Sequence, residues 1–198
     1  DQIEAGTFMF AAAVTKGDVT VKNVIPKHLE SITAKLLEIG CEVEEADDCI
    51  RVVASKPLQH TQVKTLPYPG FPTDLQSPLM ALMAAGNGNG EIRETVFEER
   101  FGTAEELRKL GARIEIQKDR ARIHGMYPLR GETVQAADLR GGAALVIAGL
   151  AAEGVTKIQN SHHIFRGYED ICGDLRALGA RVRYKDLIQR PYTKTGEC

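Results

Sequence analysis

The chain lacks several features that would indicate particular classes of protein. It has no Trp, and its 198 residues carry 25 Lys and Arg against 27 Asp and Glu, a net charge of −2 without a basic tract. That balance does not indicate a nucleic-acid partner. No apolar run approaches the roughly 18 residues of a membrane span, and the first residues show no signal-peptide pattern. We therefore expect no nucleic-acid partner and no membrane partner.

Cysteine is scarce and scattered along the chain. No two of the four cysteines form a CxxC pair and no His lies at zinc spacing from them; they are Cys41, Cys49, Cys172 and Cys198. This pattern favours reduced thiols in a cytosolic protein and predicts no metal site. The chain begins with Asp rather than Met, directly at a repeat, and we expect it to be a piece of a longer protein.

The chain does contain a threefold internal repeat. Three times an Asp introduces a strongly apolar segment and lies 16 residues before a Gly: Asp1 and Gly17, Asp74 and Gly90, Asp138 and Gly154. The apolar segments are residues 4–15, 75–85 and 141–152. They have almost no polar face, which is typical of buried helices.

Each apolar segment precedes the same series of weaker signals. A short strand is expected first, and an amphipathic helix second, as in residues 31–38 and 103–110. The second helix ends at Gly40, Gly111 or Gly179, which suits a left-handed residue beyond a helix end. These glycines are 71 and 68 residues apart, so the unit has about 70 residues. The expected strands are residues 19–24, 41–45, 50–54 and 63–65; 92–97, 112–117, 120–124 and 133–135; and 156–160 and 180–184.

These units predict the fold class α/β (α+β), in one domain over residues 1–185. Three buried helices should share a core, with small sheets and outer helices around them in a pseudo-threefold arrangement. The third unit lacks its closing strands, which the tail or another segment would have to supply. Residues 186–198 are polar, contain Pro191 and Gly196, and are expected to form an irregular tail.

Several long stretches carry a resemblance to a known family. Residues 3–8, 69–76, 94–101, 137–140 and 163–169 resemble the enolpyruvyl transferases. The resemblance implies the inside-out prism domain of that family, and specifically its C-terminal half. A short N-terminal segment of the whole enzyme would then supply the missing closing strands. The family's reactive loop cysteine and an N-terminal lysine would lie in the absent parts, and none of the four cysteines matches the loop cysteine.

The resemblance also implies a reaction. Phosphoenolpyruvate would donate its enolpyruvyl group to the 3-hydroxyl of UDP-N-acetylglucosamine, with release of phosphate, in cytoplasmic peptidoglycan precursor synthesis. No cofactor and no metal is implied. The partners would be both substrates and the complementary N-terminal half, so the chain alone is expected to be inactive. Two alternatives stay open: the sister transferase that acts on shikimate 3-phosphate, and a non-catalytic nucleotide-sugar-binding module of the same fold.

The implied catalytic residues are Asp74, Arg140 and Arg166. By resemblance, Asp74 is the base, because a sugar hydroxyl is a weak nucleophile until its proton has an acceptor. The pattern alone would favour an Asp that caps a helix, and the resemblance reverses that preference. Arg100 and Arg140 match cleft arginines, and Arg166 matches one near the phosphate and carboxylate of phosphoenolpyruvate. A guanidinium binds such groups bidentately, although a lone Arg is more often a solvated surface charge.

The remaining substrate-binding candidates are Val96, Phe97 and Asp138. By resemblance, Val96 and Phe97 touch the nucleotide sugar, Val96 through its backbone, whereas an apolar strand pair otherwise belongs to a core. Asp138 either orients a cleft arginine such as Arg140 or caps its helix. Gln2 and Phe165 depart from the family pattern, each removing a charge near the cleft, which keeps the binding-module alternative open.

Overall fold

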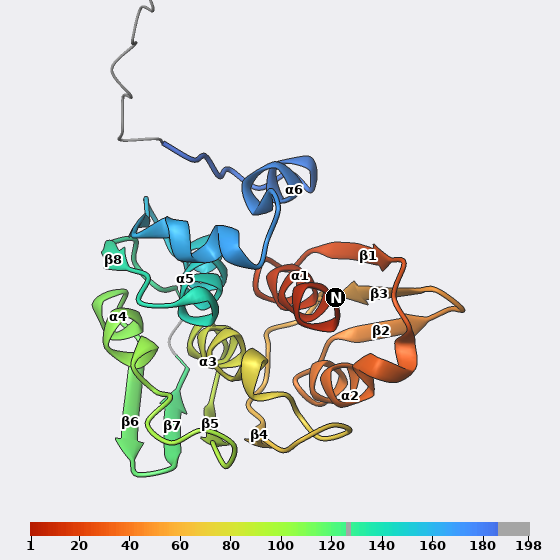
Figure 1. Ribbon diagram of the computed structural model, residues 1–198, viewed down its shortest axis with the longest axis horizontal. Helices are drawn as coiled ribbons and strands as arrows, with labels where there is room; N and C mark the ends of the chain where they lie inside the picture. The colour runs from red at the N-terminus through yellow and green to blue at the C-terminus, as the bar shows by residue number, and fades with distance from the viewer. Residues whose placement is uncertain (126–127, 186–198) are drawn as a thin grey trace, which may run out of the picture.

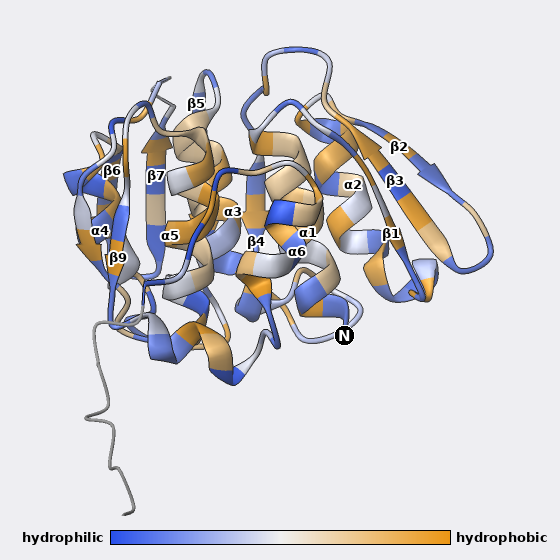
Figure 2. Cartoon of the chain, turned by 90° about the horizontal axis from the view of Figure 1, so that it is seen from above, coloured by the Kyte–Doolittle hydropathy of each residue, from blue (hydrophilic) through white to orange (hydrophobic). Residues whose placement is uncertain are grey.

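Three buried helices form the centre of the molecule. The computed structural model describes residues 1–125 and 128–185 (Figure 1). Helices α1 (Gln2–Val14), α3 (Gln76–Ala85) and α5 (Leu139–Ala151) pack on one another and are seen nearly end on in Figure 1. Every residue of α3 is buried, and apolar colours concentrate on these helices in Figure 2. The predicted shared helical core is confirmed.

The outer helices share one kind of C-terminus. They are α2 (Glu30–Glu38), α4 (Thr103–Lys109) and α6 (Ile171–Ala177). Gly40, Gly111 and Gly179 follow them with φ angles of 100°, 96° and 95°. In each case the glycine amide donates to the carbonyl three residues earlier, and the next amide donates to the carbonyl five residues earlier. This is the Schellman motif, as the sequence predicts.

The first two units build sheets with the same strand order. In the first, β1 (Asp18–Lys22), β3 (Cys49–Val53) and β2 (Glu42–Glu45) pair antiparallel in the order β1-β3-β2. In the second, β5 (Asn89–Arg93), β7 (Arg120–His124) and β6 (Arg113–Gln117) repeat that order. The recurring order confirms the repeat.

Adjacent units are joined by parallel strand pairs. Strand β4 (Gln62–Lys64) of the first unit pairs with β5 of the second. Strand β8 (Thr133–Gln135) of the second unit pairs with β9 (Lys157–Gln159) of the third. Short 3-10 turns lie at η1 (Pro26–Leu29), η2 (Thr73–Leu75) and η3 (Ser161–Arg166).

Strands β1 and β9 each lack a neighbour that their counterpart β5 has. Within the described residues, β1 has only β3 as a strand neighbour, and β9 has only β8. By the pattern of the second unit, β1 lacks a parallel neighbour and β9 lacks an antiparallel one. The third unit is therefore short of closing strands, as the sequence predicts.

Two predicted strands are wrong. The strand expected at residues 92–97 is β5 instead, which ends at Arg93. Beyond it, side chains take up the backbone donors: Thr65 Oγ1 accepts the Thr95 amide, and the buried Glu94 accepts those of Val96 and Phe97. Residues 180–184 form no strand. Their counterparts β2 and β6 pair with β3 and β7, and the described part of the third unit contains no such strand. The predicted tail, residues 186–198, lies outside the described residues.

Candidate functional site

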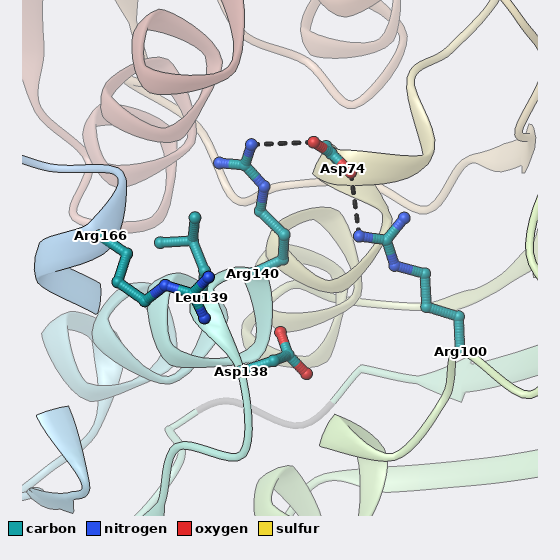
Figure 3. Close-up of a pocket in the computed structure, with 6 residues that line it drawn as sticks. All are labelled: Asp74, Arg100, Asp138, Leu139, Arg140 and Arg166. Carbon is teal, nitrogen blue, oxygen red and sulfur yellow. Dashed lines mark hydrogen bonds and ion pairs between the residues drawn. The ribbon is translucent and has the colours of Figure 1, made fainter. Parts of the chain in front are cut away.

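The charged residues singled out from the sequence line one open depression. Its volume is about 400 Å³. The lining side chains come from η2, from the segment after β5, from the start of α5 and from the end of η3 (Figure 3). They are Asp74, Arg100, Asp138, Leu139, Arg140 and Arg166. The fold thus gathers candidates from the second and third units.

Asp74 lies between two guanidinium groups. Its Oδ1 accepts a hydrogen bond of 2.9 Å from Arg100 Nη2, and its Oδ2 accepts one of 2.8 Å from Arg140 Nη2. The Asp74 side chain is 35% exposed, while those of Arg100 and Arg140 are 25% and 20% exposed. The carboxylate is therefore fixed from both sides and still reachable from solvent (Figure 3).

Asp74 does not cap its helix, unlike its counterparts in the repeat. Asp1 accepts the amides of Ile3 and Glu4 at the start of α1. Asp74 instead falls within the turn η2, and α3 begins two residues later without a side-chain cap. Pro78 has no amide to donate to the Asp74 carbonyl, which accounts for the later start. In the second unit, the Asp at this repeat position is therefore free to form ion pairs instead of capping a helix.

Asp138 is a helix cap in this structure. Its Oδ1 accepts a hydrogen bond of 2.8 Å from the Gly141 amide at the start of α5. Among the described residues it makes no ion pair. Of the two interpretations of Asp138, orienting a cleft arginine or capping its helix, the structure therefore shows the cap. It still contributes a carboxylate to the depression.

A buried tyrosine that the sequence reasoning missed lies near Arg140. Tyr168 is 2% exposed, and its hydroxyl lies 2.7 Å from Thr7 Oγ1 on α1. Burial raises the pKa of Tyr168, although the Thr7 hydrogen bond and the nearby Arg140 guanidinium oppose that shift. The hydroxyl therefore stays protonated at neutral pH. The signal in the sequence that could have identified Tyr168 was its place within residues 163–169, one of the stretches that carry the resemblance.

Arg166 is the available cation of the depression. It is exposed, and within residues 1–125 and 128–185 it has no ion-pair partner, while its side chain extends toward Leu139 (Figure 3). The preceding Phe165 is 37% exposed and packs edge-on against Tyr184 with ring centroids 5.0 Å apart. An unpaired guanidinium beside two paired ones suits an incoming phosphate or carboxylate.

Val96 and Phe97 lie beside the depression rather than in its wall. They are 40% and 56% exposed, so the alternative that they form a core pair is wrong. The Arg100 guanidinium lies over the Phe97 ring, 4.8 Å from its centroid, a cation–π contact. This contact links Phe97 to the arginine that also holds Asp74.

Glu94 is a second residue that the sequence reasoning missed. It is buried, 3% exposed, directly after β5. The available signal was strand alternation: Glu94 falls on the same face as the buried Ile92, where a core residue is expected. Its carboxylate accepts the amides of Val96 and Phe97 at 2.9 and 3.1 Å.

Two kinds of feature are absent from residues 1–125 and 128–185. These residues contain no group of three or more His, Cys, Asp or Glu side chains placed to hold a metal ion. None of their helices is both long and apolar enough to cross a membrane.

The comparisons with known proteins agree on one family. The profile described as EPSP synthase (3-phosphoshikimate 1-carboxyvinyltransferase) matches residues 1–175. UDP-N-acetylglucosamine 1-carboxyvinyltransferase 3 of Caldanaerobacter subterraneus subsp. tengcongensis is 56% identical over 92% of this chain and 44% of its own length. UDP-N-acetylglucosamine 1-carboxyvinyltransferase of Desulfofundulus thermocisternus is 54% identical over 92% of this chain and 75% of its own length.

A solved structure supports the same fold. The enolpyruvyl transferase NikO from Streptomyces tendae matches with a TM-score of 0.83 at 33% identity, over 92% of this chain and 44% of that one. The chain therefore spans less than half the length of this protein and of the Caldanaerobacter relative.

Proposed function

Because the chain belongs to the EPSP synthase family of enolpyruvyl transferases, we propose that it is the C-terminal half of one such enzyme. The whole enzyme transfers the enolpyruvyl group of phosphoenolpyruvate to the 3-hydroxyl of UDP-N-acetylglucosamine. The observation that carries this proposal is Asp74, held between Arg100 and Arg140 in a depression that Arg166 also lines.

Asp74 acts as the base in this proposal. An ionised carboxylate has about four acceptor positions, and the two arginines occupy one on each oxygen. The remaining positions can accept the hydroxyl proton as the sugar oxygen attacks. Because both guanidinium groups fix the carboxylate before substrate arrives, little reorganisation is needed at the moment of reaction.

The arginines neutralise the substrate anions. In the addition step, the sugar oxygen bonds to the carbon that carries the phosphate, and the methylene carbon takes up a proton. In the elimination step, that proton is lost and the phosphate leaves with its bonding electrons, which restores the double bond. Arg166, which is exposed and has no ion pair among the described residues, takes the phosphate or carboxylate of phosphoenolpyruvate.

The choice of acceptor rests on the relatives and on the exposed pair. The two relatives above are named for UDP-N-acetylglucosamine, which favours that acceptor over shikimate 3-phosphate. Val96 and Phe97 are exposed beside the depression, where a nucleotide sugar next to Asp74 can reach them. Peptidoglycan precursor synthesis in the cytoplasm is the corresponding role.

The complementary N-terminal half is the proposed protein partner. By the pattern of the second unit, β9 needs an antiparallel neighbour, as β7 is to β5, and β1 needs a parallel one, as β4 is to β5. A two-stranded segment that adds to both edges would close the ring of units. The other domain would then face the depression and complete the active site.

Phosphate release from phosphoenolpyruvate and UDP-N-acetylglucosamine tests the proposal. The chain is assayed alone and after assembly with the complementary half, and release is expected only from the assembly. Release by the chain alone would contradict the half-site arrangement. An assembly that UDP-N-acetylglucosamine stabilises thermally, but that releases no phosphate, would favour the binding module. Release only with shikimate 3-phosphate would favour the sister reaction.

A further inference from the structure

Glu94 joins two segments of the candidate site. Its Oε1 accepts the amides of Val96 and Phe97 and the Thr65 hydroxyl, the last at 2.7 Å. Its Oε2 accepts the Thr73 hydroxyl at 2.9 Å. One carboxylate thus holds both the residue before Asp74 and the backbone of the exposed pair.

The carboxylate is buried without a cationic partner. Among the described residues Glu94 forms no salt bridge, and all of its partners are amides or hydroxyls that donate. Burial of a charged group is costly unless hydrogen bonds compensate for it. A Glu needed only to fill this space could be replaced by an apolar residue, whereas this one spans two segments.

The connection continues to the charged site through Thr73. Its hydroxyl oxygen accepts a hydrogen bond of 2.9 Å from Arg100 Nη1, and its proton is donated to Glu94. The same Arg100 bonds Asp74 through Nη2 and covers the Phe97 ring. The direction of these bonds is therefore set: Arg100 donates to Thr73, and Thr73 donates to Glu94.

We propose that Glu94 is a positioning residue for the acceptor substrate. It fixes the segment that carries Asp74 against the segment that carries Val96 and Phe97, and so sets how the nucleotide sugar lies against the base. The inference rests on the proposed function. It predicts that changes at Glu94 affect the nucleotide sugar and leave phosphoenolpyruvate binding at Arg166 unaffected.

Glu94→Gln is a sharp test because it keeps the shape and removes one acceptor. With the amide nitrogen toward Thr73, that hydroxyl receives two donors and its own proton loses its acceptor. In the opposite orientation, the amide nitrogen of the Gln faces the backbone amides of Val96 and Phe97, which are donors as well. Either orientation leaves a buried group unsatisfied, so we expect kcat/KM for UDP-N-acetylglucosamine to fall about ten- to hundredfold. KM for phosphoenolpyruvate should stay within about twofold of the parent value.

The matched control is Glu106→Gln. Glu106 also accepts a backbone amide, that of Gln135 at 2.9 Å, and its side chain is 19% exposed, but it pairs with Lys109 on α4 rather than lining the depression. Both kinetic constants should stay within about twofold of the parent value in this variant. Hydrogen exchange of the Val96 and Phe97 amides, measured on the same assembled protein, should accelerate in Glu94→Gln and not in Glu106→Gln.

The outcomes separate this inference from the proposed function. Equal changes in the two KM values, or unchanged exchange at Val96 and Phe97, would overturn the positioning role. If the parent assembly releases no phosphate, the proposed function fails, and exchange still decides whether Glu94 holds the pair. If Glu94→Gln does not fold, Thr73→Val should show the same selective kinetic loss and Thr73→Ser should keep parent kinetics. Equal behaviour of these two variants would overturn the role.

Discussion

Replacement of Asp74 by Asn separates the chemical role of this residue from its structural one. Asn keeps the shape of the side chain and one acceptor oxygen, but its amide nitrogen must face Arg100 or Arg140, both of which donate. The variant removes the proton acceptor and half of the clamp. Loss of a general base lowers a rate by about 10²- to 10⁴-fold, which corresponds to about 3–5 kcal/mol of transition-state stabilisation.

The cost of this change to folding is expected to be much smaller. The Asp74 side chain is 35% exposed, so solvent screens both ion pairs, and each contributes at most about 1 kcal/mol. We expect the free energy of unfolding to fall by about 1–2 kcal/mol at most, and the protein to stay folded at 25 °C. A large rate loss combined with a small stability loss is the signature of a base.

Phosphate release from the assembled protein is the assay, with urea unfolding of the same sample. The matched control is Asp119→Asn, because Asp119 also lies near two arginines, with its carboxylate 2.7 Å from Arg93 and 3.9 Å from Arg120. It does not line the depression, so its variant should keep the parent rate. A folded Asp74→Asn protein that releases phosphate within threefold of the parent rate would refute the assignment of Asp74 as base.

Three further predictions concern stability. Asp138→Ala should lower the free energy of unfolding by about 1 kcal/mol through loss of the α5 cap, while Asp138→Asn, which caps equally well, should not. Urea unfolding of both variants checks this, and equal losses in the two variants would contradict the cap. Gly111→Ala should lower the free energy of unfolding by about 1–2 kcal/mol, because φ is 96° there. The control is Gly102→Ala, where φ is −55°. Equally small losses in urea unfolding of both variants would contradict this reason. Burial raises the pKa of Cys41 from 9.0 to about 11. Only the unfolded chain then ionises as pH rises from 9 toward 11, so the stability advantage of the parent over Cys41→Ala should be full below pH 9 and shrink above it; an advantage that does not change with pH would count against this shift.

Local signals in the sequence were sufficient for much of the fold. The terminal glycines of the outer helices, such as Gly40, are recognisable because a left-handed residue is tolerated mainly by Gly. Strands β7 and β8 form at the expected residues. The strand expected at residues 180–184 was wrong because strand formation depends on a partner that a local pattern does not reveal.

The candidate site was predictable as a set of residues and not as a set of contacts. The resemblance singled out Asp74, but its partners Arg100 and Arg140 lie 26 and 66 residues away in the chain. The packing of α3 against α5 brings Asp74 and Arg140 together, and the segment after β5 supplies Arg100. Glu94 escaped notice because a carboxylate in a strand next to further acidic residues resembles a solvated surface charge.

The parallel pairs between units also bear on how the chain is synthesised. Strand β4 leaves the ribosome about 27 residues before β5, the only strand with which it pairs in the described residues. At typical translation rates, that separation corresponds to roughly 1–5 s with an unpaired strand. A truncation at the end of the first unit would make that exposure permanent. The boundaries between the repeats are therefore poor places to divide this chain, although the repeat pattern suggests them first.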